Sequence, residues 1–433
     1  MIVDTALLER EKSGKPIRVG VIGAGAAGRA IALQMATPPQ GIRLAAIVNR
    51  TRERGERAFR EAGVSEWRNV QSAREAEAAI DQGIPILTDD PSVVTSCGAV
   101  DLIIEGTGTI EYATRIVLDA FHHGKHVVLV NAELDSFLGP VLNARAKRGG
   151  VVITHTDGEE PGVAMTLLRY LRGTGLRTVA AGNLKGMVDH YRNPDTQRGF
   201  AQKHDQDPKK VTSFADASKL SMETTVLANA TGFRAGRRGM YGPPCEHVRE
   251  MANLLPADQM LATGLVDYAL GAAPYTGAFV IVYEDNKLKQ AQMGYVKMGD
   301  GPFYTFYTPF HLPHIQIAST IGRAVLHGDA TVAPIAGPVC EVISMAKRDM
   351  RAGERLDGIG GFCAYGLTEN SDTARSINAL PLSLSEDCVL RRDLRKDDVI
   401  SFTDVTLPDR GVVDELWSEQ LALWPVAEHA AAK

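Results

Sequence analysis

A glycine-rich turn between an apolar strand and a helix constrains this chain most. Residues 17–22 read IRVGVI and run directly into Gly23-Ala24-Gly25-Ala26-Ala27-Gly28, after which the pattern becomes helical. A G-x-G-x-x-G run in this context is typical of a dinucleotide-binding βαβ unit. Gly23 permits the sharp turn, Gly25 lets a pyrophosphate approach the backbone, and Gly28 lets the helix pack on the strand. The other interpretation is a glycine turn without a ligand.

The pattern of strands and helices continues through the first third of the chain. Apolar runs at 17–22, 44–48, 101–104, 126–130 and 151–154 alternate with helical stretches at 26–35, 52–61 and 112–123. Such alternation predicts an α/β fold with a parallel, doubly wound sheet, which is the Rossmann architecture.

With 433 residues the chain is too long for one ordinary core, so we expect more than one domain. The rhythm changes after Thr154, and short, turn-rich segments dominate the last hundred residues. We therefore predict an NADP-binding Rossmann domain at 1–155, a central α+β catalytic and dimerisation domain at 156–330, and a small β-rich domain at 331–433.

Composition and charge exclude several classes of protein. The net charge is −5 without a long basic run, so no nucleic-acid partner is expected. The five cysteines form no Cys-x-x-Cys pair, so neither a disulfide framework nor a zinc knuckle is indicated. No apolar run of about 18 residues occurs in the sequence. We therefore expect neither a signal peptide nor a membrane anchor, and we expect a cytoplasmic enzyme that does not bind membranes.

The end of the second strand bears on the choice of dinucleotide. NAD enzymes usually place an acidic residue about 20 residues past the glycines, where it binds the ribose 2′-hydroxyl. Here that place holds Asn49, followed by Arg50 and Arg52. Guanidinium groups pair with a 2′-phosphate, so the sequence favours NADPH, unless the two arginines are solvated residues that open a helix.

Two later strand ends extend the predicted cofactor site. Gly106-Thr107-Gly108 follows the strand that ends at Glu105, and Asn131 and Glu133 follow the next strand. Both segments lie at carboxyl ends of strands, where the nicotinamide half is expected.

An acidic segment follows the last strand of the first domain. Asp157, Glu159 and Glu160 are three carboxylates within four residues. They either cap a helix that begins near Pro161 or bind a divalent ion, for which their oxygens suit Mg²⁺ or Mn²⁺.

The central region holds the candidate catalytic residues. Lys185 ends a strand, where a lysine either donates protons or is simply a surface residue at a turn.

One long helix is predicted from Pro208 to Thr231, with Asp216, Lys219 and Glu223 in a row between two apolar zones. That row indicates either a cleft tuned for proton transfer or an ion-pair ladder. The flank with Lys210, Ser213, Ser221 and Thr224 is expected to face solvent.

A loop rich in glycine and arginine follows this helix. Arg234, Arg237 and Arg238 lie within five residues of one another. Guanidinium groups beside exposed backbone N–H groups either bind a substrate phosphate or remain solvated.

Several of these segments together resemble a known family. GAGAAG, EGTG, VNAE, GNLKG and SFADASKLSMETTVLANATG make the chain similar, over nearly its whole length, to homoserine dehydrogenase-like proteins with a C-terminal SAF-like domain. Within that family the chain most resembles the DXR-like (DRL) reductoisomerases. Lys185 matches the catalytic lysine of homoserine dehydrogenases, whereas the acidic segment replaces a glycine-rich stretch of those enzymes and argues against homoserine as substrate.

The resemblance implies an activity. It implies NADPH-dependent conversion of 1-deoxy-D-xylulose 5-phosphate to 2-C-methyl-D-erythritol 4-phosphate in isoprenoid precursor synthesis, by a homodimer with a divalent metal ion. On that interpretation Asp157, Glu159 and Glu160 bind the ion, Lys185, Asp216, Lys219 and Glu223 move protons, and the arginine loop holds the phosphate. The alternatives are a dehydrogenase acting on homoserine or another small hydroxy acid or sugar, and a regulatory protein that senses NADP(H).

Overall fold

The computed structural model describes residues 2–37 and 41–425, and they form two compact units. Unit 1 comprises Met1–Asp135, Leu142–Gly162 and His311–Ala333. Unit 2 comprises Ser136–Val141, Val163–Phe310 and Pro334–Lys433. The chain thus leaves unit 1 and later returns to it, which the sequence pattern does not reveal. Helix α7 (Ala132–Arg148) contributes residues to both units.

Unit 1 is built on a seven-stranded sheet in which every strand pair is parallel. The strand order is β3-β4-β2-β1-β5-β6-β7, so the direction of winding reverses between β1 and β5. The strands are β1 (Ile17–Ile22), β2 (Ile42–Val48), β3 (Arg68–Asn69), β4 (Ile86–Thr88), β5 (Leu102–Glu105), β6 (His126–Leu129) and β7 (Ile153–His155). The predicted doubly wound α/β fold is confirmed, and the short strand β4 and the edge strand β3 are additional. In such sheets a ligand binds outside the strand ends at the reversal.

The helices of unit 1 bury the apolar strands from both sides. They are α1 (Ile2–Lys12), α2 (Ala26–Ala36), α3 (Arg52–Glu61), α4 (Ala73–Ile80), α5 (Pro91–Thr95), α6 (Glu111–His122) and α15 (Pro313–His327). Near-continuous apolar strands such as β1 are expected where helices cover both faces of a parallel sheet. Helix α15 joins this core from far along the chain, because Ile317, Ile321 and Ala324 pack into the same cluster as β1 and α2.

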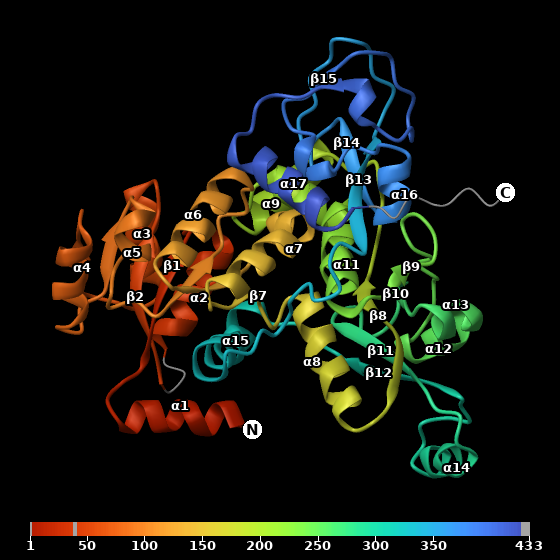
Figure 1. Cartoon of the computed structure of the whole chain (residues 1–433), viewed down its shortest axis with the longest axis horizontal. Coiled ribbons are helices and arrows are strands. Elements are labelled where there is room, and N and C mark those ends of the chain that lie inside the picture. Colours follow the sequence, from red (N-terminus) through yellow and green to blue (C-terminus); the bar gives the residue numbers. More distant parts are fainter. Residues whose placement is uncertain (1, 38–40, 426–433) are drawn as a thin grey trace. The chain divides into compact units, whose positions relative to one another are not determined.

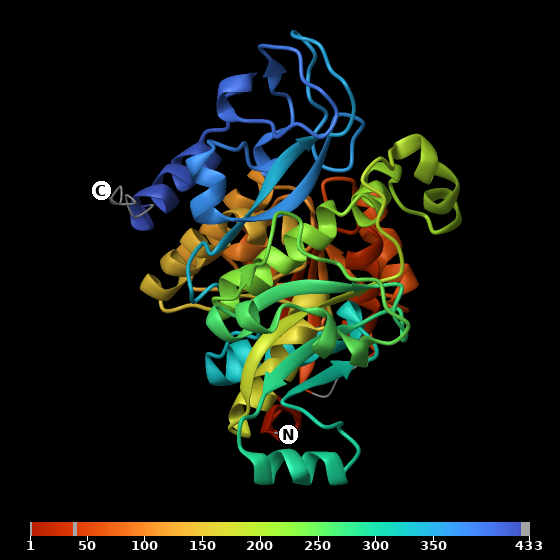
Figure 2. The same ribbon diagram turned by 90° about the vertical axis from the view of Figure 1, so that its right-hand side faces the viewer.

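Unit 2 contains a mixed five-stranded sheet in the order β12-β11-β8-β10-β9. The strands are β8 (Arg177–Lys185), β9 (Arg234–Ala235), β10 (Leu265–Leu270), β11 (Ala278–Tyr283) and β12 (Phe303–Thr308). The other elements of this region are α8 (Glu160–Gly173), α9 (Pro194–Lys203), α10 (Pro208–Ala215), α11 (Ser218–Thr231), the 3₁₀ turn η1 (Val248–Glu250), α12 (Met251–Leu254), α13 (Ala257–Ala262) and α14 (Lys287–Tyr295). Strand β8 pairs in parallel with β10 and antiparallel with β11, and Figure 2 shows the strands of this sheet in yellow, green and teal.

The last part of unit 2 forms small antiparallel sheets, as predicted. β13 (Cys340–Ala346) pairs with β14 (Ala364–Asn370), and β15 (Val389–Leu390) pairs with β16 (Val405–Thr406). Short helices complete this part: α16 (Ser371–Ser376), η2 (Leu382–Leu384), η3 (Phe402–Asp404) and α17 (Val412–Leu423).

Helix α11 is the central element of unit 2. It contacts β8 and β10 of the mixed sheet and also β13 and β14 of the C-terminal hairpin (Figure 1). All residues from Ser218 to Ala230 are therefore buried. Of the flank predicted to face solvent, Ser213, Ser221 and Thr224 are buried, so that prediction was wrong for these three residues. The hairpin that covers Ser221 and Thr224 comes from more than a hundred residues further along the chain.

The predicted single helix from Pro208 to Thr231 was also wrong. Helix α10 ends at Ala215, α11 begins at Ser218, and Ala217 between them has a φ of 76°. The Asp216 side chain accepts a hydrogen bond from the Ser218 backbone N–H (2.9 Å). An aspartate that bonds the backbone two residues on competes with helix continuation, which accounts for the break.

Within the described ranges, no helix is long and apolar enough to cross a bilayer.

Candidate functional site

The glycine-rich turn of unit 1 has the geometry that a dinucleotide requires. A Cβ on Gly28 would lie 1.9 Å from the Gly23 carbonyl oxygen, and Gly23 has a φ of +103°. Both positions therefore require glycine for the turn and for helix packing. A Cβ on Gly25 would meet nothing within 4 Å, so the turn is open where a pyrophosphate would approach. Gly25 also caps α2 without a side-chain hydrogen bond, which leaves the first-turn N–H groups to a phosphate.

The end of β2 is tied to this turn. The Asn49 Oδ1 atom accepts a hydrogen bond from the Ala24 N–H (3.0 Å), and its Nδ2 group donates to the Thr51 carbonyl (2.7 Å). Asn49 thus stabilises the turn from the position where NAD enzymes place a carboxylate. Arg50 and Arg52 follow it and are exposed to solvent. The predicted residues therefore lie at one strand end, next to the glycine turn.

A buried carboxylate organises the loops where the nicotinamide half is expected. Glu105, at the end of β5, accepts hydrogen bonds from the Thr107 N–H (2.8 Å), the Thr107 hydroxyl and Asn131 Nδ2 (2.7 Å). Burial raises the pKa of Glu105, and these hydrogen bonds oppose the shift. Asn131 also accepts a bond from the Leu134 N–H (3.1 Å), which caps α7, and Glu133 lies buried in the first turn of that helix.

The 106–108 segment and Asn131 are therefore joined through one side chain. Sequence reasoning did not select Glu105 as a site residue. Its place directly before Gly106 was the signal that could have found it.

A second buried charge cluster of unit 1 surrounds His155, at the end of β7. Its Nδ1 atom lies 3.0 Å from Asp135 Oδ2, and its Nε2 atom lies 2.6 Å from Glu159 Oε2. Burial opposes a charge on the ring, but the neighbouring carboxylates of Asp135 and Glu159 outweigh it and raise the pKa of His155 to about 9. Sequence reasoning missed this histidine, although it directly precedes the acidic segment.

The predicted divalent-metal site is not supported by the arrangement of its three carboxylates. Glu159 is paired with His155, Asp157 accepts a bond from the Gly158 N–H (2.9 Å), and Glu160 opens helix α8. In residues 2–37 and 41–425, no group of three or more histidine, cysteine, aspartate or glutamate side chains is placed to hold a metal ion. The residues do not fit a metal, and the alternative interpretation, an acid at the start of a helix near Pro161, fits Glu160.

Lys185 and Glu223 meet in unit 2. Lys185 ends β8, and its Nζ atom lies 3.2 Å from Glu223 Oε2 on α11. The same oxygen accepts a hydrogen bond from Asn183 Nδ2 (3.0 Å). The Glu223 side chain is 4% exposed whereas that of Lys185 is 18% exposed, so the ammonium group is the accessible member. Lys219, one turn before Glu223 on α11, is buried.

Asn183 is a further residue of this cluster. It is fully buried, and among the described residues its Oδ1 atom has no hydrogen-bond partner. A buried acceptor without a partner is uncommon, so Asn183 Oδ1 is a candidate to accept a hydrogen bond from a bound ligand. The GNLKG motif contains Asn183, but the sequence predicted a chemical role only for Lys185 of that motif.

Asp216 does not join the predicted row with Lys219 and Glu223. It lies in the break before α11, is fully buried, and forms an ion pair with Lys347 (2.8 Å). Burial raises its pKa and the Lys347 ammonium lowers it, with burial the larger effect. The predicted row assumed one continuous helix, whereas Asp216 lies before α11 and Ala217 interrupts the helix between them.

The three arginines of the predicted phosphate loop are engaged within unit 2. Arg234 binds both oxygens of Asp372 (2.7 Å each), and Arg238 pairs with Glu369 (2.9 Å). Arg237 donates to the carbonyls of Met240 (2.9 Å) and Tyr241 (3.2 Å). The loop therefore is not the open cradle that the sequence predicted, because its charge pairs with the hairpin region and its own turn.

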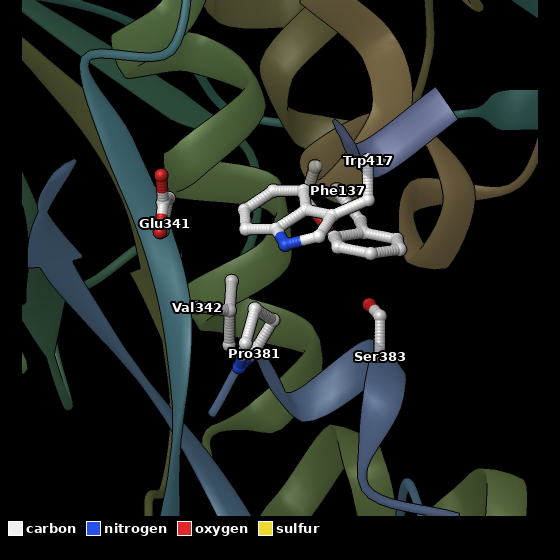
Figure 3. A pocket seen from close by; sticks show the side chains of 7 residues that line it. Phe137, Glu341, Val342, Pro381, Ser383 and Trp417 are labelled. Atoms are coloured by element: carbon white, nitrogen blue, oxygen red, sulfur yellow. The ribbon is translucent and has the colours of Figure 1, made fainter. Parts of the chain in front are cut away.

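A small pocket of unit 2 lies elsewhere in the C-terminal part of the chain (Figure 3). Its walls are Ser136, Phe137, Glu341, Val342, Pro381, Ser383 and Trp417, none of which is a predicted site residue. The Phe137 and Trp417 rings stack at 4.9 Å, and the Glu341 carboxylate is held by Arg375 (2.6 Å). With these partners the pocket offers no candidate for catalysis.

Comparisons with known proteins find matches for two segments of the chain. Residues 23–156 match the family model of the homoserine dehydrogenase NAD binding domain, and residues 158–317 match that of the oxidoreductase DRL catalytic domain. The homoserine dehydrogenase of Pseudomonas aeruginosa is 28% identical over 139 residues, which cover 32% of this chain and 28% of that protein. The enzyme of Mycobacterium leprae is 38% identical over 58 residues, 13% of either chain. The matched segments thus span less than a third of these curated relatives.

Solved structures with a similar course of the chain include two from Lactobacillus casei. Apo scyllo-inositol dehydrogenase aligns with a TM-score of 0.42 and 10% identity, over 73% of this chain and 89% of that one. Myo-inositol dehydrogenase in complex with NAD(H) and myo-inositol aligns with a TM-score of 0.37 and 13% identity, over 72% and 85%.

The glycine turn, the strand order and the two family matches agree on the class of protein. This chain combines a homoserine dehydrogenase-type NAD-binding domain with a DRL catalytic domain, and it is an NAD(P)-binding oxidoreductase of that group.

Proposed function

We propose that this protein is an NADPH-dependent reductoisomerase that converts 1-deoxy-D-xylulose 5-phosphate to 2-C-methyl-D-erythritol 4-phosphate. The observation that carries the proposal is the contact between Lys185 and Glu223. It lies inside the segment that matches the DRL catalytic domain. We further propose a homodimer, which sedimentation velocity would test.

The dinucleotide site favours NADPH over NADH. The glycine turn and the first turn of α2 would hold the pyrophosphate, and Arg50 and Arg52 would pair with the 2′-phosphate. When bound, NADPH supplies the hydride for the reduction. Replacing both arginines (Arg50→Ala/Arg52→Ala) should weaken NADPH binding by about 10–100-fold and leave NADH binding unchanged, as measured by fluorescence titration.

The residues at the end of β8 are suited to move protons. Skeletal rearrangement of a hydroxyketone requires a proton to leave a hydroxyl group and another to reach the carbonyl oxygen. Glu223 is a base that accepts the first, and the Lys185 ammonium donates the second. Before the reduction, Glu223 returns its proton to Lys185 across their 3.2 Å contact. The aldehyde carbon then gains a hydride from NADPH, and its oxygen gains that proton from Lys185, whose ammonium form is restored by a proton from solvent. Lys219 adds positive charge on the same helix, which stabilises a developing oxyanion.

No step of this proposal runs through a metal ion, because the three predicted carboxylates do not fit one. The enzyme should therefore be assayed with and without Mn²⁺. A requirement for the ion would point to ligands other than Asp157, Glu159 and Glu160.

The proposal is tested by following NADPH oxidation with a panel of substrates. We expect turnover with 1-deoxy-D-xylulose 5-phosphate and none with aspartate semialdehyde, the substrate of the homoserine direction. The match of residues 23–156 to homoserine dehydrogenases favours that second activity as the alternative. Faster oxidation with the semialdehyde, or with any phosphate-free compound, would contradict the reductoisomerase proposal.

A further inference from the structure

The start of helix α11 is fixed by the two oxygens of one carboxylate. Asp216 Oδ1 accepts the hydrogen bond from the Ser218 N–H (2.9 Å), and Oδ2 accepts one from the Lys347 ammonium (2.8 Å). Ala217 adopts a left-handed conformation between them, with a φ of 76°. A non-glycine residue in this region is strained and persists only when its surroundings hold it there.

Lys347 helps to keep the segment around Ala217 in this conformation. Its Nζ atom donates to Asp216 Oδ2, to the Arg192 carbonyl and to the Gly361 carbonyl, each at 2.8 Å. An ammonium group has three donors, so all its hydrogen-bonding capacity is used. The side chains of Lys347 and Asp216 are 3% and 0% exposed. One buried cation thus joins the segment before α9, the break before α11 and the C-terminal region of unit 2.

The C-terminal hairpin braces the rest of the helix. The Gly366 N–H donates to Ser218 Oγ (2.9 Å), Ser221 Oγ donates to the Gly366 carbonyl (3.0 Å), and the hydroxyls of Thr224 and Thr368 lie 3.0 Å apart. At about 100° per residue, the centre of these three helix residues lies about 160° around α11 from Glu223. The hairpin therefore holds the back of the helix whose front carries Glu223 towards Lys185.

We infer that Lys347 is a positioning residue: its contacts with Asp216, Arg192 and Gly361 fix the start of α11 so that Glu223 meets Lys185. The C-terminal region of unit 2 thereby becomes part of the support of the candidate site. The expected effect on activity rests on the proposed function. A displacement of about 1 Å at a site of this kind can cost about 100-fold in rate.

The experiment compares Lys347→Met with Arg375→Met in the full chain. Arg375 also forms a buried ion pair in unit 2, but its partners are Glu341 and the Trp424 carbonyl, outside residues 189–231. We expect Lys347→Met to lower kcat at least tenfold, with KM changed less than about threefold and NADPH affinity unchanged. Amide hydrogen exchange across 216–226 should accelerate in Lys347→Met and not in Arg375→Met. Equal effects of the two substitutions on kcat and on exchange would overturn the inference.

Two further results keep the test decisive. If Lys347→Met does not fold, Thr368→Val removes one brace without leaving a buried charge. Thr368→Val should lower kcat and accelerate amide hydrogen exchange of α11. A wild-type kcat together with a wild-type exchange rate would overturn the inference. If the wild type turns over no 1-deoxy-D-xylulose 5-phosphate, the proposed function fails, whereas the exchange measurement still decides the inference because it needs no substrate.

Discussion

Two buried glutamates, Glu105 of unit 1 and Glu223 of unit 2, show how differently a carboxylate can be used. Both oxygens of Glu105 accept hydrogen bonds from neutral donors of Thr107 and Asn131. Glu223 instead shares one oxygen between an amide and the ammonium group of Lys185, which is partly exposed. Beside it, the buried Oδ1 atom of Asn183 has no partner among the described residues.

The difference separates a scaffold from a candidate reaction site. A buried carboxylate whose acceptors are satisfied by neutral groups holds loops in place. A carboxylate paired with an accessible cation, beside an acceptor without a partner, is arranged for a ligand and for proton transfer. The same substitution at the two positions should therefore have different consequences.

The largest effect is expected from Glu223→Gln. An amide neither accepts a proton from substrate nor balances the charge of Lys185, so kcat should fall by about 100-fold or more. NADPH affinity should stay within about threefold of the wild type. Steady-state kinetics and fluorescence titration measure the two quantities. The matched control is Glu284→Gln, because Glu284 also pairs with a lysine of unit 2, Lys289 (3.1 Å). A loss of rate as large in the control would break the comparison.

The corresponding change in unit 1, Glu105→Gln, should act on the dinucleotide. The new NH₂ group would face the donors of Thr107 or Asn131, and a buried donor without a partner costs about 1–3 kcal/mol. We expect NADPH affinity to fall by about tenfold, with kcat at saturating NADPH within about threefold. If kcat fell as far as in Glu223→Gln, Glu105 would belong to the chemistry and the distinction would be lost.

A smaller effect is expected from Asn183→Ala. The substitution removes the hydrogen bond to Glu223 Oε2 and the buried acceptor, but it leaves the ion pair with Lys185. The rate should fall by about tenfold, since one hydrogen bond to a charged group contributes about 1.5 kcal/mol. Measuring kcat for Asn183→Ala and Asn183→Asp sharpens the test. Unchanged rates in both variants would show that the amide has no part in the site.

The smallest expected effect is on stability and concerns His155, a third buried residue whose ring is enclosed by fixed partners as Glu105 is. Its pKa is raised from 6.5 to about 9 by Asp135 and Glu159 in spite of burial. A raised pKa means that the folded state binds the proton more tightly than the unfolded chain. The stabilisation is therefore complete below pH 6.5 and is lost as the pH rises through about 9. Urea unfolding at several pH values should show this decline in the wild type and a weaker one in His155→Gln.

The first unit was largely predictable from sequence because its determinants are local. Near-continuous apolar strands, the spacing of Gly23, Gly25 and Gly28, and turn residues at strand ends fix a doubly wound sheet. Glu105 and His155 were not predicted as site residues, because their roles depend on partners that other strands and helices supply. A buried ion pair leaves no periodic pattern in the sequence.

The second unit was less predictable because distant segments decide its character. The periodicity of 208–231 predicted one helix with a solvent-exposed side, but the hairpin of β13 and β14 covers that side of α11. The hydroxyl groups of Ser221 and Thr224 were predicted to face solvent, although they form hydrogen bonds with Gly366 and Thr368 of β14. Likewise, the arginines at 234–238 looked free until Asp372 and Glu369 were found beside Arg234 and Arg238. Lys185 was predicted because it is a charged residue at the end of a strand, and Glu223 because it lies between two apolar zones of a predicted helix. The contact between them could not be predicted, because it depends on how β8 and α11 pack.

The central claim is most directly tested by isotope transfer. The protein would be incubated with 1-deoxy-D-xylulose 5-phosphate and NADPH carrying deuterium at the transferred position, and the product analysed by mass spectrometry. The account predicts 2-C-methyl-D-erythritol 4-phosphate with one deuterium, formed by the wild type and strongly reduced in Lys185→Met. Unchanged substrate with the wild type, or deuterium found only in homoserine when aspartate semialdehyde is supplied, would contradict it.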